Sequence, residues 1–193
     1  MAVLEFVMIL MAIIVGLGIA EILRCSSRIL LGVVVPGRVH TVWMATVFLQ
    51  LIEVVVAAWG FRDRADWTFL QILALLAPTA VLYVAATVLN GVPNGADADE
   101  FFMERRRPFL GLLAAMITIF SIQGWNLIFG WLQFGWGPNL FRIGQLALLG
   151  VLAVTSSRRF HHLGAIAYLL VLIWFVVLYS PSLSNVLTPL PGM

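Results

Sequence analysis

The sequence predicts an all-α integral membrane protein with a bundle of about six transmembrane helices. Two observations support this prediction. First, 62% of its 193 residues are hydrophobic and only 10% are charged, and the mean hydropathy is +1.05. A small soluble domain leaves roughly 40% of its unfolded surface exposed, and soluble chains carry about 25% charged residues. Second, the apolar residues form runs close to the roughly 20 residues that a helix needs to cross a bilayer. Lipid forces each backbone group to be paired within its own segment, which favours helices.

Most of the expected spans are bounded by arginines, prolines or glycines, and together they make one transmembrane domain over residues 1–180. We expect them at about residues 2–23, 41–61, 67–89, 108–132, 139–155 and 163–179. The first has no basic segment before it and carries Glu5, so we expect a retained span and not a signal peptide. The fifth is the shortest and contains two polar residues. Residues 181–193, with three prolines, are expected to form a short external tail.

Two connecting segments carry structural signals. Residues 24–39 hold three arginines around an apolar stretch that is too short to cross. We expect either a continuation of the first helix past the bilayer surface or an interfacial helix, ended by Pro36 and Gly37. In the longest loop, Asp97 followed three residues later by Glu100 predicts a capping box. A short surface helix through residues 101–103 should follow, with Pro108 in the first turn of the next span.

The arginines predict the orientation. If the N-terminus is outside, the inner loops carry Arg24, Arg28, Arg38, Arg105, Arg106, Arg107, Arg158 and Arg159, against Arg62, Arg64 and Arg142 outside. Basic residues favour the cytoplasmic side, so we expect a multi-pass protein of the bacterial inner (plasma) membrane with both termini periplasmic. Tryptophans settle at membrane interfaces, and four of them fall at the expected outer one. These are Trp59, Trp67, Trp131 and Trp136.

Glu53 is the most informative candidate residue, because an ionisable side chain inside a span costs at least about 2.5 kcal/mol and is by default functional. It belongs to a stripe with three-four spacing that must face protein or water. The stripe comprises Trp43, Thr46, Gln50, Glu53, Ala57 and Gly60. Two interpretations stay open. Gln50 and Glu53 line a conduction or binding pathway, or they hydrogen-bond to other helices for about 0.6–2 kcal/mol per bond.

Further intramembrane polar candidates are Asn126 in the fourth span and Arg142 and Gln145 in the fifth. All three are expected at a similar depth in the outer half of the bilayer. Arg142 is either the ionic partner of Glu53 or a side chain that extends outward from a short helix to the interface.

The first span carries small residues four apart, Ala12, Gly16 and Ala20, which allow another helix to approach closely. Near its inner end, Glu21 is expected to form an ion pair with Arg24, Arg28 or one of Arg105–Arg107.

Catalysis and cofactor binding are not expected. The chain has no nucleophile elbow, no HExxH, no phosphate-binding glycine loop and no CxxC motif. Its single cysteine, Cys25, rules out a multi-cysteine metal site. A bis-histidine haem needs two imidazoles inside the bundle. His40, His161 and His162 fall instead in expected surface loops at the inner face, so we expect no cofactor and no metal. Membrane topology explains the basic residues better than nucleic-acid binding does.

Several segments resemble a set of small uncharacterised polytopic inner-membrane proteins of proteobacteria, without an assigned activity. The resemblance covers about the first two thirds of the chain. It is carried by GLGIAEILR (16–24), RVHTVW (38–43), the stretch 50–59, ADWTFL (65–70), PTAVLYVAA (78–86) and the Asp-rich loop before ERRRPF (104–109). It implies a bacterial inner-membrane location.

We therefore expect a homo-oligomeric channel or transporter for a small ion or solute, lined by Gln50, Glu53 and the polar residues of the fourth and fifth spans. The short loops leave no soluble domain for another activity. The alternative is a non-catalytic accessory or scaffold subunit of a larger membrane complex, with the face of Ala12, Gly16 and Ala20 as a contact.

Overall fold

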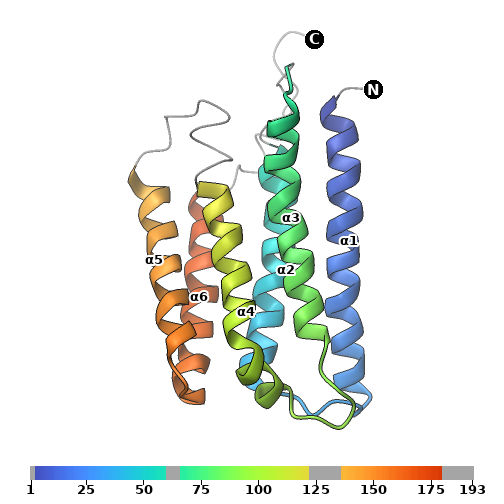
Figure 1. Cartoon of the computed structure of the whole chain (residues 1–193), viewed down its shortest axis with the longest axis vertical. Coiled ribbons are helices and arrows are strands. Elements are labelled where there is room, and N and C mark those ends of the chain that lie inside the picture. The colour runs from blue at the N-terminus through green and yellow to red at the C-terminus, as the bar shows by residue number, and fades with distance from the viewer. Residues whose placement is uncertain (1–2, 60–65, 122–135, 180–193) are drawn as a thin grey trace.

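The computed structural model describes residues 3–59, 66–121 and 136–179, and these fold into six helices. Their bounds are α1 Val3–Leu30, α2 Arg38–Trp59, α3 Phe69–Asn90, α4 Ala98–Ile119, α5 Trp136–Val154 and α6 Arg158–Tyr179. Within these ranges the only β-type pairing is an isolated bridge between Val35 and Asp97. The helices run alternately up and down, so that α1 begins and α6 ends at the same end of the bundle (Figure 1). The predicted all-α class is confirmed.

Four helices are long and apolar enough to cross a membrane: α1, α2, α3 and α6. α4 contains the charged segment 99–107 in its first half, and its predicted span, 108–132, extends beyond the described residues. The apolar part of α5 described here, Leu140–Val154, is shorter than a full crossing. The predicted tail, 181–193, also lies outside the described residues.

α2 occupies the centre of the helix arrangement. It packs against α1, α3, α4 and α6, while α1 makes its most extensive contact with α3, and α5, at the edge of the bundle, packs against α4 and α6. The core follows the buried side of α2 along the bundle and includes Val47, Leu51 and Val54. This placement explains why α2 carries the largest number of polar residues that are shielded from lipid.

α1 continues past the expected end of the first span to Leu30, as in the first of the two alternatives above. Gly32, with φ of 71°, ends it by allowing the amides of Val33 and Val34 to reach back to the Arg28 carbonyl at 2.9 and 3.3 Å. The Arg28 guanidinium donates to the carbonyls of Asn90 and Val92 at 3.0 and 2.5 Å. The extended end of α1 is thereby attached to the segment after α3.

The predicted ion pair of Glu21 is confirmed, with Arg24 as its partner at 3.0 Å. The same carboxylate accepts a hydrogen bond from the Asn90 amide. The ion pair is local to one face of α1, and the hydrogen bond from Asn90 joins that face to the end of α3.

The prediction of a separate surface helix over residues 101–103 is wrong. α4 is one helix from Ala98, and Pro108 lies inside it and not in a first turn. Asp97 caps it as predicted, accepting from the amides of Asp99 and Glu100 at 2.8 and 3.2 Å. Phe102 is 2% exposed, so tertiary packing holds the first turns of α4 against the bundle and carries the helix through the proline.

The small residues Ala12, Gly16 and Ala20 lie on an exposed face of α1. The close approach within the chain uses Gly18 instead, where an added Cβ would lie 3.0 Å from a methyl carbon of Leu51 on α2. At Gly16 an added Cβ would meet nothing within 4 Å. The predicted contact face is therefore free in the single chain.

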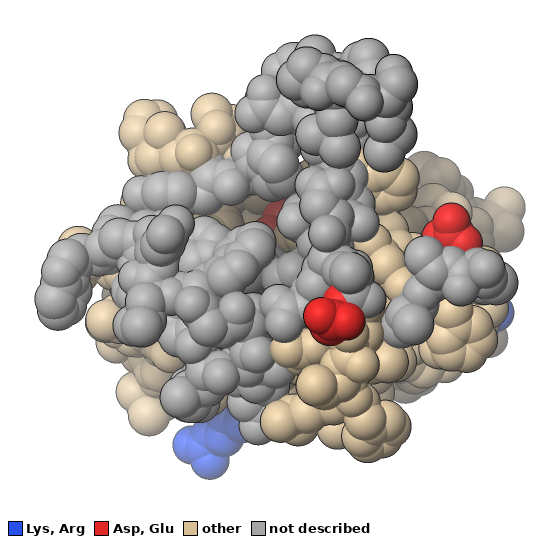
Figure 2. Space-filling view, turned by 90° about the horizontal axis from the view of Figure 1, so that it is seen from above, with Lys and Arg blue, Asp and Glu red and all other residues tan. Residues whose placement is uncertain are grey.

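The outer surface of the bundle is strongly apolar. Phe69, Leu163 and Val177 are 79%, 67% and 72% exposed, and similar side chains occur on every helix except α4. Viewed from the end where α1 begins, the described surface shows charged groups at only a few points (Figure 2). Exposed apolar surface on this scale is expected where lipid covers a protein.

We predict that Gly37→Ala destabilises the fold. An added Cβ would lie 2.5 Å from the Asp99 backbone nitrogen and closer still to the Asp99 carboxylate, so the α2 and α4 starts must separate. Overpacking of this kind costs about 1–3 kcal/mol. Denaturant unfolding in detergent, followed by circular dichroism, should show a lower midpoint. Gly111→Ala, which meets nothing within 4 Å, is the control, and equal midpoints for both variants would contradict the prediction.

Candidate functional site

The first part of the α2 stripe predicted from the three-four spacing faces the protein interior. Trp43 and Thr46 are fully buried and Gln50 is 3% exposed, and His40, which was not part of the predicted stripe, is fully buried one turn earlier. Further along, Glu53 and Ala57 are partly buried, and Gly60 lies outside the described residues. Polar groups of α2 therefore follow one line from its start to beyond its middle.

Aromatic rings pack around this line near the start of α2. The Trp43 ring lies 5.3 Å from Phe109 of α4, 6.2 Å from Phe102 of α4 and 5.3 Å from Tyr168 of α6, between ring centroids. Offset and edge-on arrangements at these distances are each worth about 0.5–1.5 kcal/mol beyond area burial. The cluster joins three helices and fixes the rotation of α2 in the bundle.

Gln50 hydrogen-bonds across to α6. Its Nε2 donates to the Tyr168 hydroxyl at 3.0 Å, within the buried interior. The Gln50 carbonyl oxygen Oε1 is buried without a hydrogen-bond partner. Tyr168 was missed by the sequence analysis, although it is the only hydroxyl-bearing residue between Leu163 and Leu178, and that isolation is a usable signal.

Glu53 of α2 and Arg142 of α5 carry opposite charges on two different helices. Among the residues that the structure describes, no ion pair within 4 Å joins them. Nη1 of Arg142 is buried and has no hydrogen-bond partner, so part of the guanidinium turns inward. Both alternatives for Arg142, pairing with Glu53 and extension outward to the interface, stay open.

Gln145, three residues after Arg142 on the same helix, is 6% exposed. α5 thus presents an amide and a guanidinium to the interior. We call Gln50, Glu53, Arg142, Gln145 and Tyr168 the interior polar cluster. Asn126, the remaining candidate, lies outside the described residues.

The placement of the histidines in surface loops is wrong. His40 lies in α2 and His161 and His162 in α6, and the first two are fully buried. Both helices begin earlier than predicted, because local capping and burial extend them beyond the apolar runs.

His40 and His161 each connect a helix start to a neighbouring backbone. Nε2 of His40 lies 2.8 Å from the Leu89 carbonyl oxygen and Nε2 of His161 lies 2.9 Å from that of Thr155. A carbonyl oxygen only accepts, so Nε2 carries the proton in both rings. His161 also packs edge-on to Phe102 at 6.1 Å. These contacts give both rings a structural role at the ends of α3 and α5.

Among the described residues, no group of three or more His, Cys, Asp and Glu side chains is arranged to hold a metal ion. No protein-family model, curated protein or solved structure matches the chain. The chemistry of the site is therefore argued from its own groups. A carboxylate, a guanidinium, two amides and a phenol inside an apolar bundle can exchange an internal partner for an ion or a small polar solute.

We predict that the Gln50–Tyr168 bond contributes about 0.6–2 kcal/mol to stability, the range of hydrogen bonds between membrane helices. Tyr168→Phe removes the hydroxyl that accepts from Gln50. A double-mutant cycle with Gln50→Leu, measured by unfolding in detergent, should show coupling of that size. Tyr83→Phe, which removes a hydroxyl from a partly buried tyrosine on α3, is the control. Additive losses from the two changes would contradict the prediction.

Proposed function

We propose that this chain is a membrane transport protein that moves a small ion or polar solute through the interior of its own bundle. The observation that carries the proposal is a set of buried polar side chains inside an apolar bundle. Gln50 donates to the Tyr168 hydroxyl at 3.0 Å, Gln145 is 6% exposed, and Nη1 of Arg142 is buried without a hydrogen-bond partner. Ionisable residues in such a setting are costly and mark substrate or ion pathways in membrane proteins.

The position of the interior polar cluster supports a pathway within each chain. Gln50 on α2, Gln145 on α5 and Tyr168 on α6 are buried within the chain and are not on its outer surface. A pore formed between copies would require such groups on an outer face. We therefore propose transport within each subunit of a homo-oligomer rather than a shared central channel.

We also propose that all six helices cross the bacterial inner membrane, with both termini in the periplasm. The alternating helix directions place the starts of α2, α4 and α6 at one end. Arg24, Arg28, Arg38, Arg105–Arg107, Arg158 and Arg159 belong to this end, and Arg142 belongs to the other half. The excess of basic residues supports a cytoplasmic location for the first end.

We predict that Glu53→Gln lowers transport by about tenfold or more, because a loss of 1.4 kcal/mol in the interaction with the solute is a factor of ten. Purified protein in liposomes would be assayed for flux of H⁺, Na⁺, K⁺ and Cl⁻ with ion-sensitive dyes. Glutamine keeps the size of the side chain and removes its charge.

The matched control is Glu104→Gln, which neutralises an exposed carboxylate on α4 and should leave flux unchanged. Gel filtration would show that both variants keep the size of the unmodified protein. If flux through Glu53→Gln equals that of the unmodified protein, or if the unmodified protein carries none of these ions, ion transport at Glu53 is wrong.

The second candidate function is an accessory or scaffold subunit of a membrane complex. The observation that favours it is the exposed face of Ala12, Gly16 and Ala20, which none of the described helices covers. Small residues at this spacing let two membrane helices approach closely. A second copy or a different membrane subunit fits this face equally well.

We predict that Gly16→Leu weakens association of the chain with itself or with a co-purifying membrane subunit. A leucine at a close helix contact costs about 1–3 kcal/mol through overpacking. Size-exclusion chromatography with light scattering would measure the assembly. Gly111→Leu places the same side chain on an exposed position of α4 as the control. Assembly that is unaffected by Gly16→Leu would remove this face as a contact.

A further inference from the structure

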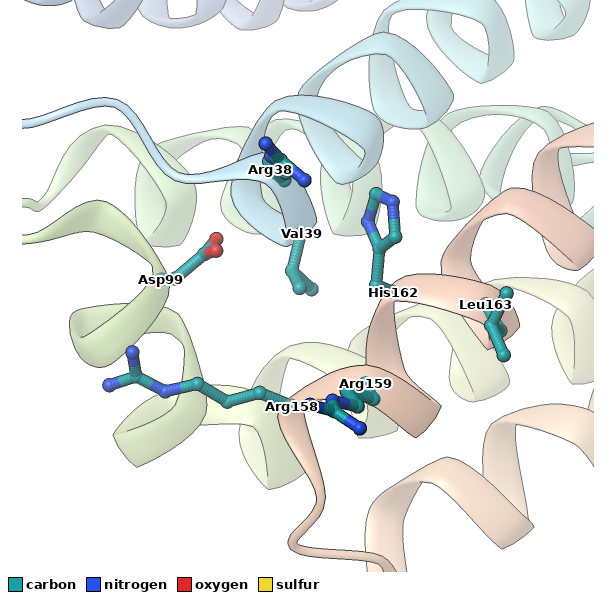
Figure 3. Close-up of a pocket in the computed structure, with 7 residues that line it drawn as sticks. All are labelled: Arg38, Val39, Asp99, Arg158, Arg159, His162 and Leu163. Atoms are coloured by element: carbon teal, nitrogen blue, oxygen red, sulfur yellow. The ribbon is translucent and has the colours of Figure 1, made fainter.

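A cavity of about 390 Å³ opens at the arginine-rich end of the bundle, away from the interior polar cluster. It lies between the starts of α2, α4 and α6 and is lined by Arg38, Val39, Asp99, Arg158, Arg159, His162 and Leu163 (Figure 3). Its volume falls in the range of about 300–1,000 Å³ that is typical of small-molecule sites.

The lining is strongly cationic. Three arginines against one aspartate leave a formal excess of two positive charges. Among the described residues, none of these three arginines forms an ion pair within 4 Å. Arg38 and Arg158 are also the first residues of α2 and α6, so the positive ends of two helix dipoles meet at the cavity.

Asp99, the one acidic residue of the lining, already has a structural role. Oδ1 of Asp99 accepts the His40 backbone N–H at 2.9 Å and so caps the start of α2. The three guanidinium groups are therefore the charged groups of the lining that remain available to an anion.

We propose that this cavity binds a phosphate-bearing anion. Guanidinium groups match the geometry of phosphate oxygens and form two parallel charge-assisted hydrogen bonds with them. The apolar lining residue Leu163 is 67% exposed, so the cavity is continuous with the surface that lipid would cover. The phosphate belongs either to an anionic phospholipid of the cytoplasmic leaflet or to a soluble phosphate compound.

The test uses the full-length protein in detergent and two probes, inorganic phosphate and short-chain phosphatidylglycerol, with binding measured by calorimetry. We expect Arg158→Gln to weaken binding by about tenfold or more, because it removes charge-assisted hydrogen bonds. Arg107→Gln removes an exposed arginine from the same end without changing the cavity lining and should change binding by less than about twofold.

Binding of the lipid alone supports a lipid headgroup site, and competition between lipid and inorganic phosphate supports a site for soluble phosphates. Short-chain phosphatidylcholine, whose choline cation the arginines repel, should bind more weakly. If neither probe binds, or if the two arginine variants weaken binding equally, the proposal is wrong. Glu53→Gln should bind the anion as the unmodified protein does, which separates this site from transport.

Discussion

The arrangement of the bundle depends on one constraint: lipid offers no hydrogen-bond partners, so the polar side of α2 must be covered by other helices. His40, Trp43, Thr46 and Gln50 lie along that side, and all are shielded. Covering them requires α2 to be surrounded, and it contacts α1, α3, α4 and α6. The outer helices in turn are free to expose apolar faces. The burial of one polar stripe therefore sets the order of the helices around it.

The buried polar groups are of two kinds: some form hydrogen bonds within the protein, and others have at least one polar atom without a hydrogen-bond partner. The Thr46 hydroxyl donates to the Val42 carbonyl at 2.8 Å, and the Thr79 hydroxyl donates to that of Leu75 at 3.1 Å. These groups are satisfied within their own helices. Oε1 of Gln50 and Nη1 of Arg142 are buried without partners. Unpaired buried groups cost about 1–3 kcal/mol each, a cost that a bound solute would remove. Nε1 of Trp43 and Nδ1 of His40 and His161 are likewise buried without partners, so incomplete bonding extends along α2 and into α6 and is not confined to the interior polar cluster.

Features that depend on local residue spacing could be predicted from the sequence. Features that depend on which helices become neighbours could not. The three-four spacing on α2 located the buried stripe, and Asp97 located the start of α4. The partner of Gln50 could not be read from spacing, because Tyr168 is 118 residues away. Pro108 and the turn residues before it indicated a break, yet burial of Phe102 carries α4 through that region. For the same reason His40 and His161, close to expected loops, are core residues.

The two proposed sites share a pair of helices, which gives them a physical connection. The cavity at the arginine-rich end is lined by the first residues of both α2 and α6. Further along the same two helices, Gln50 contacts Tyr168, and Glu53 lies one turn beyond Gln50. An anion bound there as proposed would offset the repulsion between Arg38 and Arg158. It would thereby favour the α2–α6 contact by an amount that grows with the logarithm of the anion concentration once the site is filled.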